Sequence, residues 1–286
     1  MKPNDPVRVG LKVAVYVLLY VLVAFFFGPL FGWLGGILVG ITMTGLAAAL
    51  IANGYALRIY EGKHLADLGL HWNADSARNL LIGLIGGVGS VILVLLPPLL
   101  VGAAYFRPDP AAEVNFATAV FIPVLLLMGA AGEEILFRGY GFQVLLRALG
   151  PYATIVPVGV LFALLHASNP NAEQYPLGLV NTAGFGILFG YAFLLSQDLW
   201  LPIGLHYGWN VTLPFFGVNI SGITMKLTGY VLEWKAGPLW SGGEYGPEAS
   251  ILTSFLFVLL WLFLRKAPIR RQPNPLLDVP EEASHV

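Results

Sequence analysis

Residues 116–149 read FATAVFIPVLLLMGAAGEEILFRGYGFQVLLRAL, an apolar run interrupted by two adjacent acids and by basic residues. Crossing the roughly 30 Å hydrocarbon layer of a bilayer takes about 20 apolar residues in a helix. The run is too long for one perpendicular helix, so we expect it to tilt, kink or emerge from the membrane. Its continuous hydrophobicity favours a helix over a barrel strand, in which apolar and polar residues alternate.

The rest of the chain has the same character. Of its 286 residues, 57% are apolar and only 11% are charged, and the mean hydropathy is +0.75. Soluble domains carry about 25% charged residues, so the composition excludes an ordinary soluble enzyme. The chain has 15 lysines and arginines against 16 acids, which argues against a nucleic-acid partner. It has no cysteine, which excludes disulfides and thiolate metal sites.

Other apolar runs accompany the first one along the chain. The expected membrane spans are 11–31, 33–53, 79–103, 116–149, 152–168, 177–196, 199–216 and 250–265. We therefore predict an all-α membrane protein, a bundle of about eight transmembrane helices that forms a single domain over 1–266, with a flexible tail over 267–286. Several spans also carry small-xxx-small spacings, which are typical of helices whose backbones approach closely. These are Gly36/Gly40, Gly83/Gly87 and Gly186/Gly190.

The basic residues gather on one side of the predicted bundle. If the amino terminus is cytoplasmic, eleven of them lie inside: Lys2, Arg8, Lys12, Arg58, Lys63, Arg78, Arg147, Arg265, Lys266, Arg270 and Arg271. Three lie outside: Arg107, Lys226 and Lys235. Because basic residues are enriched on the cytoplasmic side, we predict a multi-pass integral membrane protein with both termini in the cytoplasm.

Ionisable residues within three of the spans are the candidate functional residues, because a charge inside a bilayer is costly. Residues 132–138 read GEEILFR, 162–166 read FALLH and 206–210 read HYGWN. Glu134 and Arg138 are four residues apart, so we expect them to form an ion pair on one helix face. Glu133 points about 100° away from Glu134 and has no cation at helical spacing.

The remaining polar residues suggest two chemical roles. His206 and Asn210 are four residues apart and project from one helix face, and Glu133, His166 and His206 can meet in one cavity. Glu133 and His166 can share a water molecule that one of them deprotonates. His206 and Asn210 can donate hydrogen bonds to the oxyanion that then develops. Alternatively, the acid and the two histidines form a His₂Glu zinc site, although the compact HExxH zinc signature is absent.

These three motifs, in this order on separate apolar helices, resemble the CPBP family. This family includes the CAAX prenyl protease type 2 (Rce1-like) enzymes and bacteriocin-processing intramembrane endopeptidases. The matching residues are Glu133, Glu134, Arg138, Phe162, His166, His206 and Asn210. The resemblance covers about 116–216, whereas the earlier helices match only in hydrophobicity.

The resemblance implies an eight-helix membrane peptidase whose cavity opens toward the cytoplasm. It assigns water activation to Glu133 and His166, and oxyanion stabilisation to His206 and Asn210. Glu134 assists, Arg138 holds the helices and Phe162 shapes the cavity wall. It also implies a peptide, lipidated or membrane-embedded protein substrate. We favour a reaction without a metal, with zinc on Glu133, His166 and His206 as the alternative.

Two other functions fit the same intramembrane residues. One is a secondary transporter in which Glu133 and the histidines relay protons; the chain shows no inverted repeat of the kind common in transporters. The other is a non-catalytic membrane protein, for immunity or scaffolding, that keeps the cavity without using it.

Overall fold

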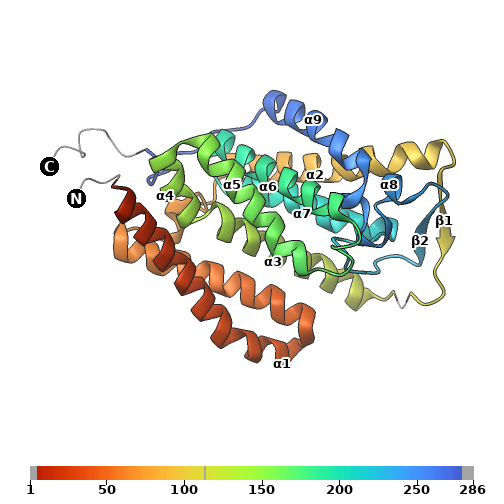
Figure 1. The fold of residues 1–286 in the computed structure, drawn as a ribbon, viewed down its shortest axis with the longest axis horizontal. Coiled ribbons are helices and arrows are strands. Elements are labelled where there is room, and N and C mark those ends of the chain that lie inside the picture. Colours follow the sequence, from red (N-terminus) through yellow and green to blue (C-terminus); the bar gives the residue numbers. More distant parts are fainter. Residues whose placement is uncertain (1–4, 113, 279–286) are drawn as a thin grey trace.

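Helices make up most of the computed structural model, which describes residues 5–112 and 114–278 (Figure 1). The helices are α1 (Pro6–Tyr60), α2 (Ala74–Leu100), α3 (Phe116–Arg138), α4 (Tyr140–Leu149), α5 (Pro151–Leu165), α6 (Pro176–Ser196), α7 (Trp200–Thr212), α8 (Pro238–Ser241) and α9 (Ile251–Lys266). Short 3-10 turns are η1 (Leu65–Leu68), η2 (His166–Ser168), η3 (Leu213–Phe216), η4 (Gly243–Tyr245) and η5 (Pro247–Ala249). Within the described residues, five apolar segments are long enough to cross a membrane: 6–60, 74–100, 116–149, 151–168 and 176–196. The predicted fold class, an all-α membrane protein, is confirmed.

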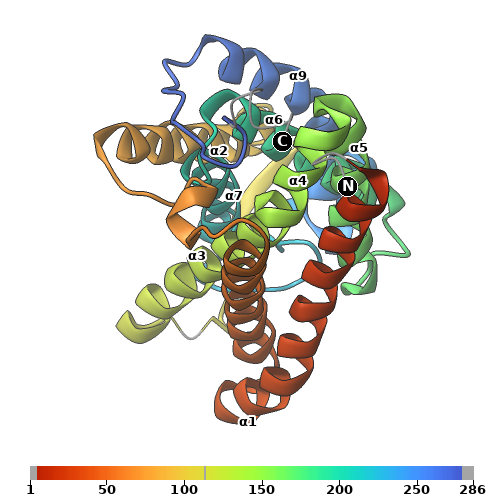
Figure 2. The ribbon, with the colours of Figure 1, turned by 90° about the vertical axis from the view of Figure 1, so that its left-hand side faces the viewer.

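α1 is a hairpin of two antiparallel helices (Figures 1 and 2). Gly36 interrupts the helix with φ 75° and ψ −176°, a conformation that glycine reaches without strain. The two arms correspond to the predicted spans 11–31 and 33–53. A buried ion pair between Lys12 and Glu61 joins the open ends of the hairpin, so the arms stay together at that end.

The long run 116–149 breaks at Gly139, between α3 and α4. Asn53 of α1 fills the break: its Nδ2 donates to the carbonyl of Ile135 at 3.1 Å, and its Oδ1 accepts from the amide of Tyr140 at 2.6 Å. A Cβ at residue 139 would lie 2.3 Å from that Oδ1, so only glycine fits. The expected departure of this run from one straight span is confirmed, and it ends α3 directly after Arg138.

α2 and α7 pack with their backbones almost in contact. A Cβ at Gly83 or Gly87 of α2 would lie 2.3 Å from a carbonyl oxygen of α7. A Cβ at Gly204 of α7 would lie 2.3 Å from a carbonyl oxygen of α2, and Gly208 repeats the contact at 2.8 Å. This close packing fixes the position of α7, which carries His206.

The two ends of the molecule differ. The start of α1 and the helix α4, which carry Arg8 and Arg147, lie at one end (Figure 1). The antiparallel strands β1 (Ala104–Pro108) and β2 (Tyr230–Trp234) lie at the other, with Ala104 opposite Trp234. Lys2, one of the basic residues predicted to be cytoplasmic, lies outside the described residues. Which end faces the cytoplasm stays a prediction.

The segment after α9 differs from the flexible tail that we expected over 267–286. Its described part, up to residue 278, returns to the helices, and the amide of Asn274 is completely buried. Asn274 Nδ2 donates to the side chain of Gln143 and to the carbonyl of Gln197. The polar side chains that suggested a solvated tail instead satisfy groups at helix ends. Residues 279–286 lie outside the described residues.

Candidate active site

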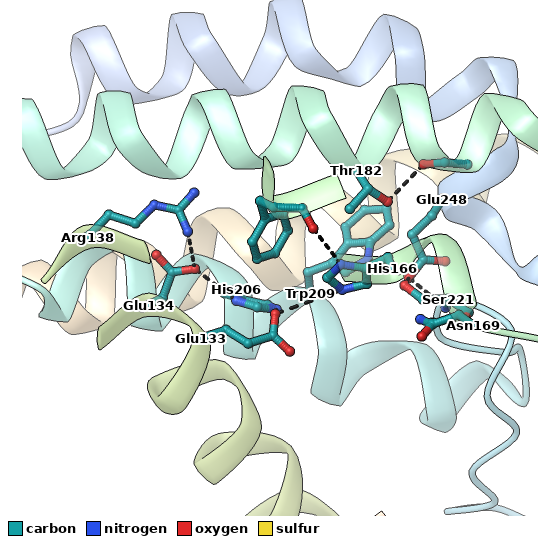
Figure 3. Close-up of polar contacts among 12 residues, drawn as sticks. Glu133, Glu134, Arg138, His166, Asn169, Thr182, His206, Trp209, Ser221 and Glu248 are labelled. Atoms are coloured by element: carbon teal, nitrogen blue, oxygen red, sulfur yellow. Dashed lines mark hydrogen bonds and ion pairs between the residues drawn. The ribbon is translucent and has the colours of Figure 1, made fainter. Parts of the chain in front are cut away.

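Glu134 of α3 is completely buried, and one of its carboxylate oxygens accepts hydrogen bonds from two side chains. Its Oε1 accepts from Arg138 Nη1 at 3.2 Å and from His206 Nδ1 at 3.0 Å (Figure 3). The ion pair expected from the four-residue spacing is therefore present. The hydrogen bond to His206 is new, and it joins α3 to α7 and fixes the orientation of the imidazole.

Arg138 is enclosed by protein rather than by solvent. Its Nη2 donates to the carbonyl of Gly186 on α6 at 2.6 Å, and its guanidinium lies 5.2 Å from the ring centre of Phe162 and 5.5 Å from that of Phe189. These contacts suit a buried guanidinium, which needs hydrogen-bond acceptors and aromatic faces. Arg138 thus ties α3 to α6, as the structural role implied by the resemblance requires.

Glu133 has the opposite environment from its neighbour. Its side chain is 38% exposed, and its Oε2 has no hydrogen-bond partner. This Oε2 lies 3.9 Å from Nε2 of His166 and also 3.9 Å from Nε2 of His206. Both distances, between side chains drawn in Figure 3, are too long for a direct hydrogen bond, and a water molecule can bridge polar groups at such a separation.

Each histidine is oriented through its second ring nitrogen. His166 follows the last residue of α5, and its Nδ1 lies 2.9 Å from the carbonyl of Phe162. Nδ1 must donate this bond, so in the neutral ring Nε2 carries a lone pair that faces Glu133. The Phe162 ring packs against both imidazoles, with ring centres 4.9 Å from His166 and 5.8 Å from His206.

These groups line a cavity of about 350 Å³, in the range of small-molecule and peptide sites. Glu133, His166, His206 and Asn210 all face it. Its walls come from α1, α3, α5, α6 and α7, and it extends to the loop that contains Ile220 and Met225 and follows η3. Asn210 shares the cavity with His206, as the four-residue spacing predicted.

The three candidate zinc ligands lie slightly farther apart than the ligands of a tetrahedral zinc ion. Two ligands of a tetrahedral zinc, each about 2.0–2.1 Å from the metal, lie about 3.4 Å apart, whereas Glu133 Oε2 is 3.9 Å from each histidine. The described residues also contain no group of three His, Asp or Glu side chains arranged to hold a metal. The reaction without a metal stays a prediction.

Sequence reasoning missed part of the cavity wall. Glu248, Ser221 and Trp209 line its far end, and Tyr20 and Thr42 of the α1 hairpin line its side. Glu248 and Ser221 belong to a loop region that the sequence placed outside the membrane, so no helical spacing linked them to the histidines. Trp209 lies three residues after His206, and this helical spacing is the signal in the sequence that could have placed it on the same face of α7.

Comparison with known proteins finds one matching family. Residues 115–212 match the family described as type II CAAX prenyl endopeptidase Rce1-like. No curated protein matches the chain, and no solved structure does. The matched segment runs from the start of α3 to the end of α7, and all three motifs lie within it. Over this segment, about a third of the chain, the protein is similar to the family of CAAX proteases that its motifs resemble.

Proposed function

We propose that this protein is an intramembrane endopeptidase that hydrolyses a peptide bond with a water molecule activated by Glu133 and His166. The observation that carries the proposal is the unpartnered Oε2 of Glu133, which lies 3.9 Å from Nε2 of both histidines. An acid in this position holds a water against an imidazole lone pair, which is the arrangement that general-base hydrolysis needs.

The proposed reaction proceeds in two steps. Glu133 takes a proton from the water, and the water oxygen forms a bond to the carbonyl carbon of the substrate. The carbonyl oxygen becomes an oxyanion, which accepts hydrogen bonds from the side-chain amide of Asn210 and from Nε2 of protonated His206. Glu133 then delivers its proton to the amide nitrogen as the carbon–nitrogen bond breaks, so the acid is returned to its starting state.

Glu134 supports the charged form of His206 in this scheme. Its carboxylate accepts the Nδ1 hydrogen of the ring at 3.0 Å, and a positive imidazole strengthens that bond. Arg138 shares the same carboxylate and keeps it in place. The pair therefore acts on the reaction through His206 and not by touching the substrate.

The side from which the substrate approaches depends on the orientation of the chain. The cavity extends from Glu133 toward the end with β1 and β2, whereas α1 begins at the opposite end. Cleavage near the cytoplasmic face, which the resemblance implies, requires the end with β1 and β2 to be cytoplasmic. The basic residues favour the reverse orientation, with the opening on the other side. Labelling of cysteines introduced at Arg147 and Lys235 with a membrane-impermeant maleimide distinguishes the two.

The test of the proposed function compares Glu133→Gln with the wild type in liposomes. Membrane proteins from a host that lacks the gene serve as substrate, and new peptide termini are labelled and identified by mass spectrometry. We expect termini that depend on the wild type and are absent with Glu133→Gln, because the amide cannot accept the proton. Glu173→Gln, an exposed acid between α5 and α6, is the matched control and should cleave normally. Identical termini from the Glu133 variant, or none from the wild type, contradict the proposal.

A further inference from the structure

The far end of the cavity contains a second carboxylate, which the proposed reaction does not use. Glu248 lies in η5, just before α9, and is only 3% exposed. It lines the same cavity as Glu133 and His166. A buried acid at a cavity wall is costly unless it has a partner, so its surroundings indicate what it binds.

Glu248 is fixed in place by neutral groups from two directions. Its Oε1 accepts from Nε1 of Trp209 at 3.3 Å and from the amide of Ser221 at 3.2 Å (Figure 3). Its backbone carbonyl accepts from Nδ2 of Asn181 at 2.7 Å. Its Oε2 has no hydrogen-bond partner. Gly246, with φ 110°, leaves no space for a Cβ next to Asn219, so the loop presents this acid in one position.

The cavity offers Glu248 no lysine or arginine partner, and its histidines lie at the other end, beside Glu133. Among the described residues that line it, none is a lysine or arginine, and its other acid is Glu133. Arg138 is engaged by Glu134 and does not reach the cavity wall. Burial without a positive partner raises the pKa of Glu248 to about 7. A group with a positive charge is therefore the ligand that this end of the cavity favours.

We propose that Glu248 binds a lysine or arginine side chain of the peptide substrate, a few residues from the bond that is cleaved. Trp209, which donates to Glu248, lies three residues after His206, or about 4.5 Å along α7. An extended peptide advances about 3.3 Å per residue, so a basic side chain one to three residues from the reacting bond reaches the acid. This specificity rests on the proposed function.

The first test measures binding without catalysis. n-Butylguanidinium serves as the probe, and n-butanol serves as a neutral molecule of similar length. We expect the guanidinium to raise the thermal unfolding midpoint of the wild type by about 3 °C when it is roughly ten times above its dissociation constant. Glu248→Gln keeps the acceptor for Trp209 and loses the charge, so its midpoint should not rise. Glu244→Gln, an exposed acid of the same loop region, should respond like the wild type.

The second test measures specificity with a peptide library presented to the reconstituted protein. We expect lysine or arginine to be enriched about tenfold at one position near the cleaved bonds, for the wild type and Glu244→Gln but not for Glu248→Gln. Cleavage by the wild type without a basic preference, or an unchanged preference in Glu248→Gln, overturns the proposal. An equal guanidinium effect in Glu248→Gln, or none in the wild type, also overturns it. If the wild type cleaves no peptide at all, the proposed function fails, while the thermal measurement still decides whether Glu248 binds a cation.

Discussion

Two walls of the cavity are built from glycine-rich helices, yet they pack very differently. α7 forms one wall and packs on α2 behind it, where a Cβ at Gly87 of α2 would lie 2.3 Å from the carbonyl of Leu205 and 2.6 Å from the amide of Trp209. In the wall formed by the α1 hairpin, a Cβ at Gly45 would meet its nearest neighbour, Tyr20 Oη, at 3.8 Å. The first is a backbone contact without space, and the second is an ordinary van der Waals distance.

The difference separates α7, which positions polar side chains of the cavity, from the α1 hairpin, which has space to move near Gly45. α7 carries His206 and Asn210, whose atoms must be placed within a fraction of an ångström for hydrogen bonding to an oxyanion. The α1 hairpin contributes mostly apolar and small residues to the cavity and contacts mainly α3 and α4. A tightly packed wall therefore holds His206 and Asn210, the groups proposed to bind the oxyanion, and the hairpin wall is looser around Gly45 and Gly129.

The largest expected effect comes from adding one methyl group to the tight wall. Gly87→Ala should destabilise the protein by at least about 3 kcal/mol, because the methyl clashes with backbone atoms that cannot rotate away. Displacement of His206 should lower cleavage at least about 100-fold. Gly45→Ala is the matched control, and its unfolding midpoint should equal or slightly exceed that of the wild type. Thermal unfolding and cleavage by a stable Gly87→Ala that match the wild type would show that this wall does not position the site.

The sequence predicts much of this arrangement but not which glycines are in contact. The spans and the pair Glu134–Arg138 follow from hydrophobicity and helical spacing, which are local properties. Small-xxx-small spacing occurs in α1 at Gly36/Gly40, where Gly36 forms the bend of the hairpin and has open space around it, as well as in α2 at Gly83/Gly87, where both glycines meet the backbone of α7. In a chain with 34 glycines only the partner helix distinguishes the two, and the identity of that partner is a tertiary property.

In the candidate site, too, local patterns in the sequence predict some features, whereas contacts between distant residues could not be predicted. The three motifs indicate that Glu133, His166 and His206 share a cavity, because each lies within an apolar span. The bond between Glu134 and His206 joins residues 72 positions apart, and no spacing rule predicts it. Glu248 and the buried Asn274 were assigned to solvated segments because they are polar, but they satisfy groups that the fold leaves without partners.

A smaller effect is expected from restraining the loose wall. A Cβ at Gly129 of α3 would lie 3.8 Å from Cγ2 of Thr42 on α1, which is within reach of a disulfide. The chain has no cysteine of its own, so the pair Thr42→Cys and Gly129→Cys forms a single defined bond. If movement of the hairpin admits the substrate, oxidation should lower cleavage roughly tenfold and a reductant should restore it. Each single variant is a control, and unchanged cleavage after complete oxidation would exclude the hairpin as the access route.

The smallest effect concerns the acid that the tight wall holds through Trp209. The folded pKa of Glu248, about 7, lies above its ordinary value of 4.5, so the folded protein retains a proton that the unfolded chain releases. The free energy of unfolding of the wild type should therefore fall as the pH rises from about 4.5 to about 7, and this contribution should be constant above that range. Glu248→Gln lacks this loss, so its unfolding midpoint should match the wild type near pH 4.5 and exceed it at pH 8. The nearby Tyr245 does not titrate in this range, because burial raises its pKa above the ordinary value of 10.0.

A constant difference in unfolding midpoint between Glu248→Gln and the wild type across the pH range would mean that Glu248 keeps one protonation state. A gain confined to high pH would mean that the protein gives up stability to keep a negative charge beside its reacting groups, as a binding site for a cation requires.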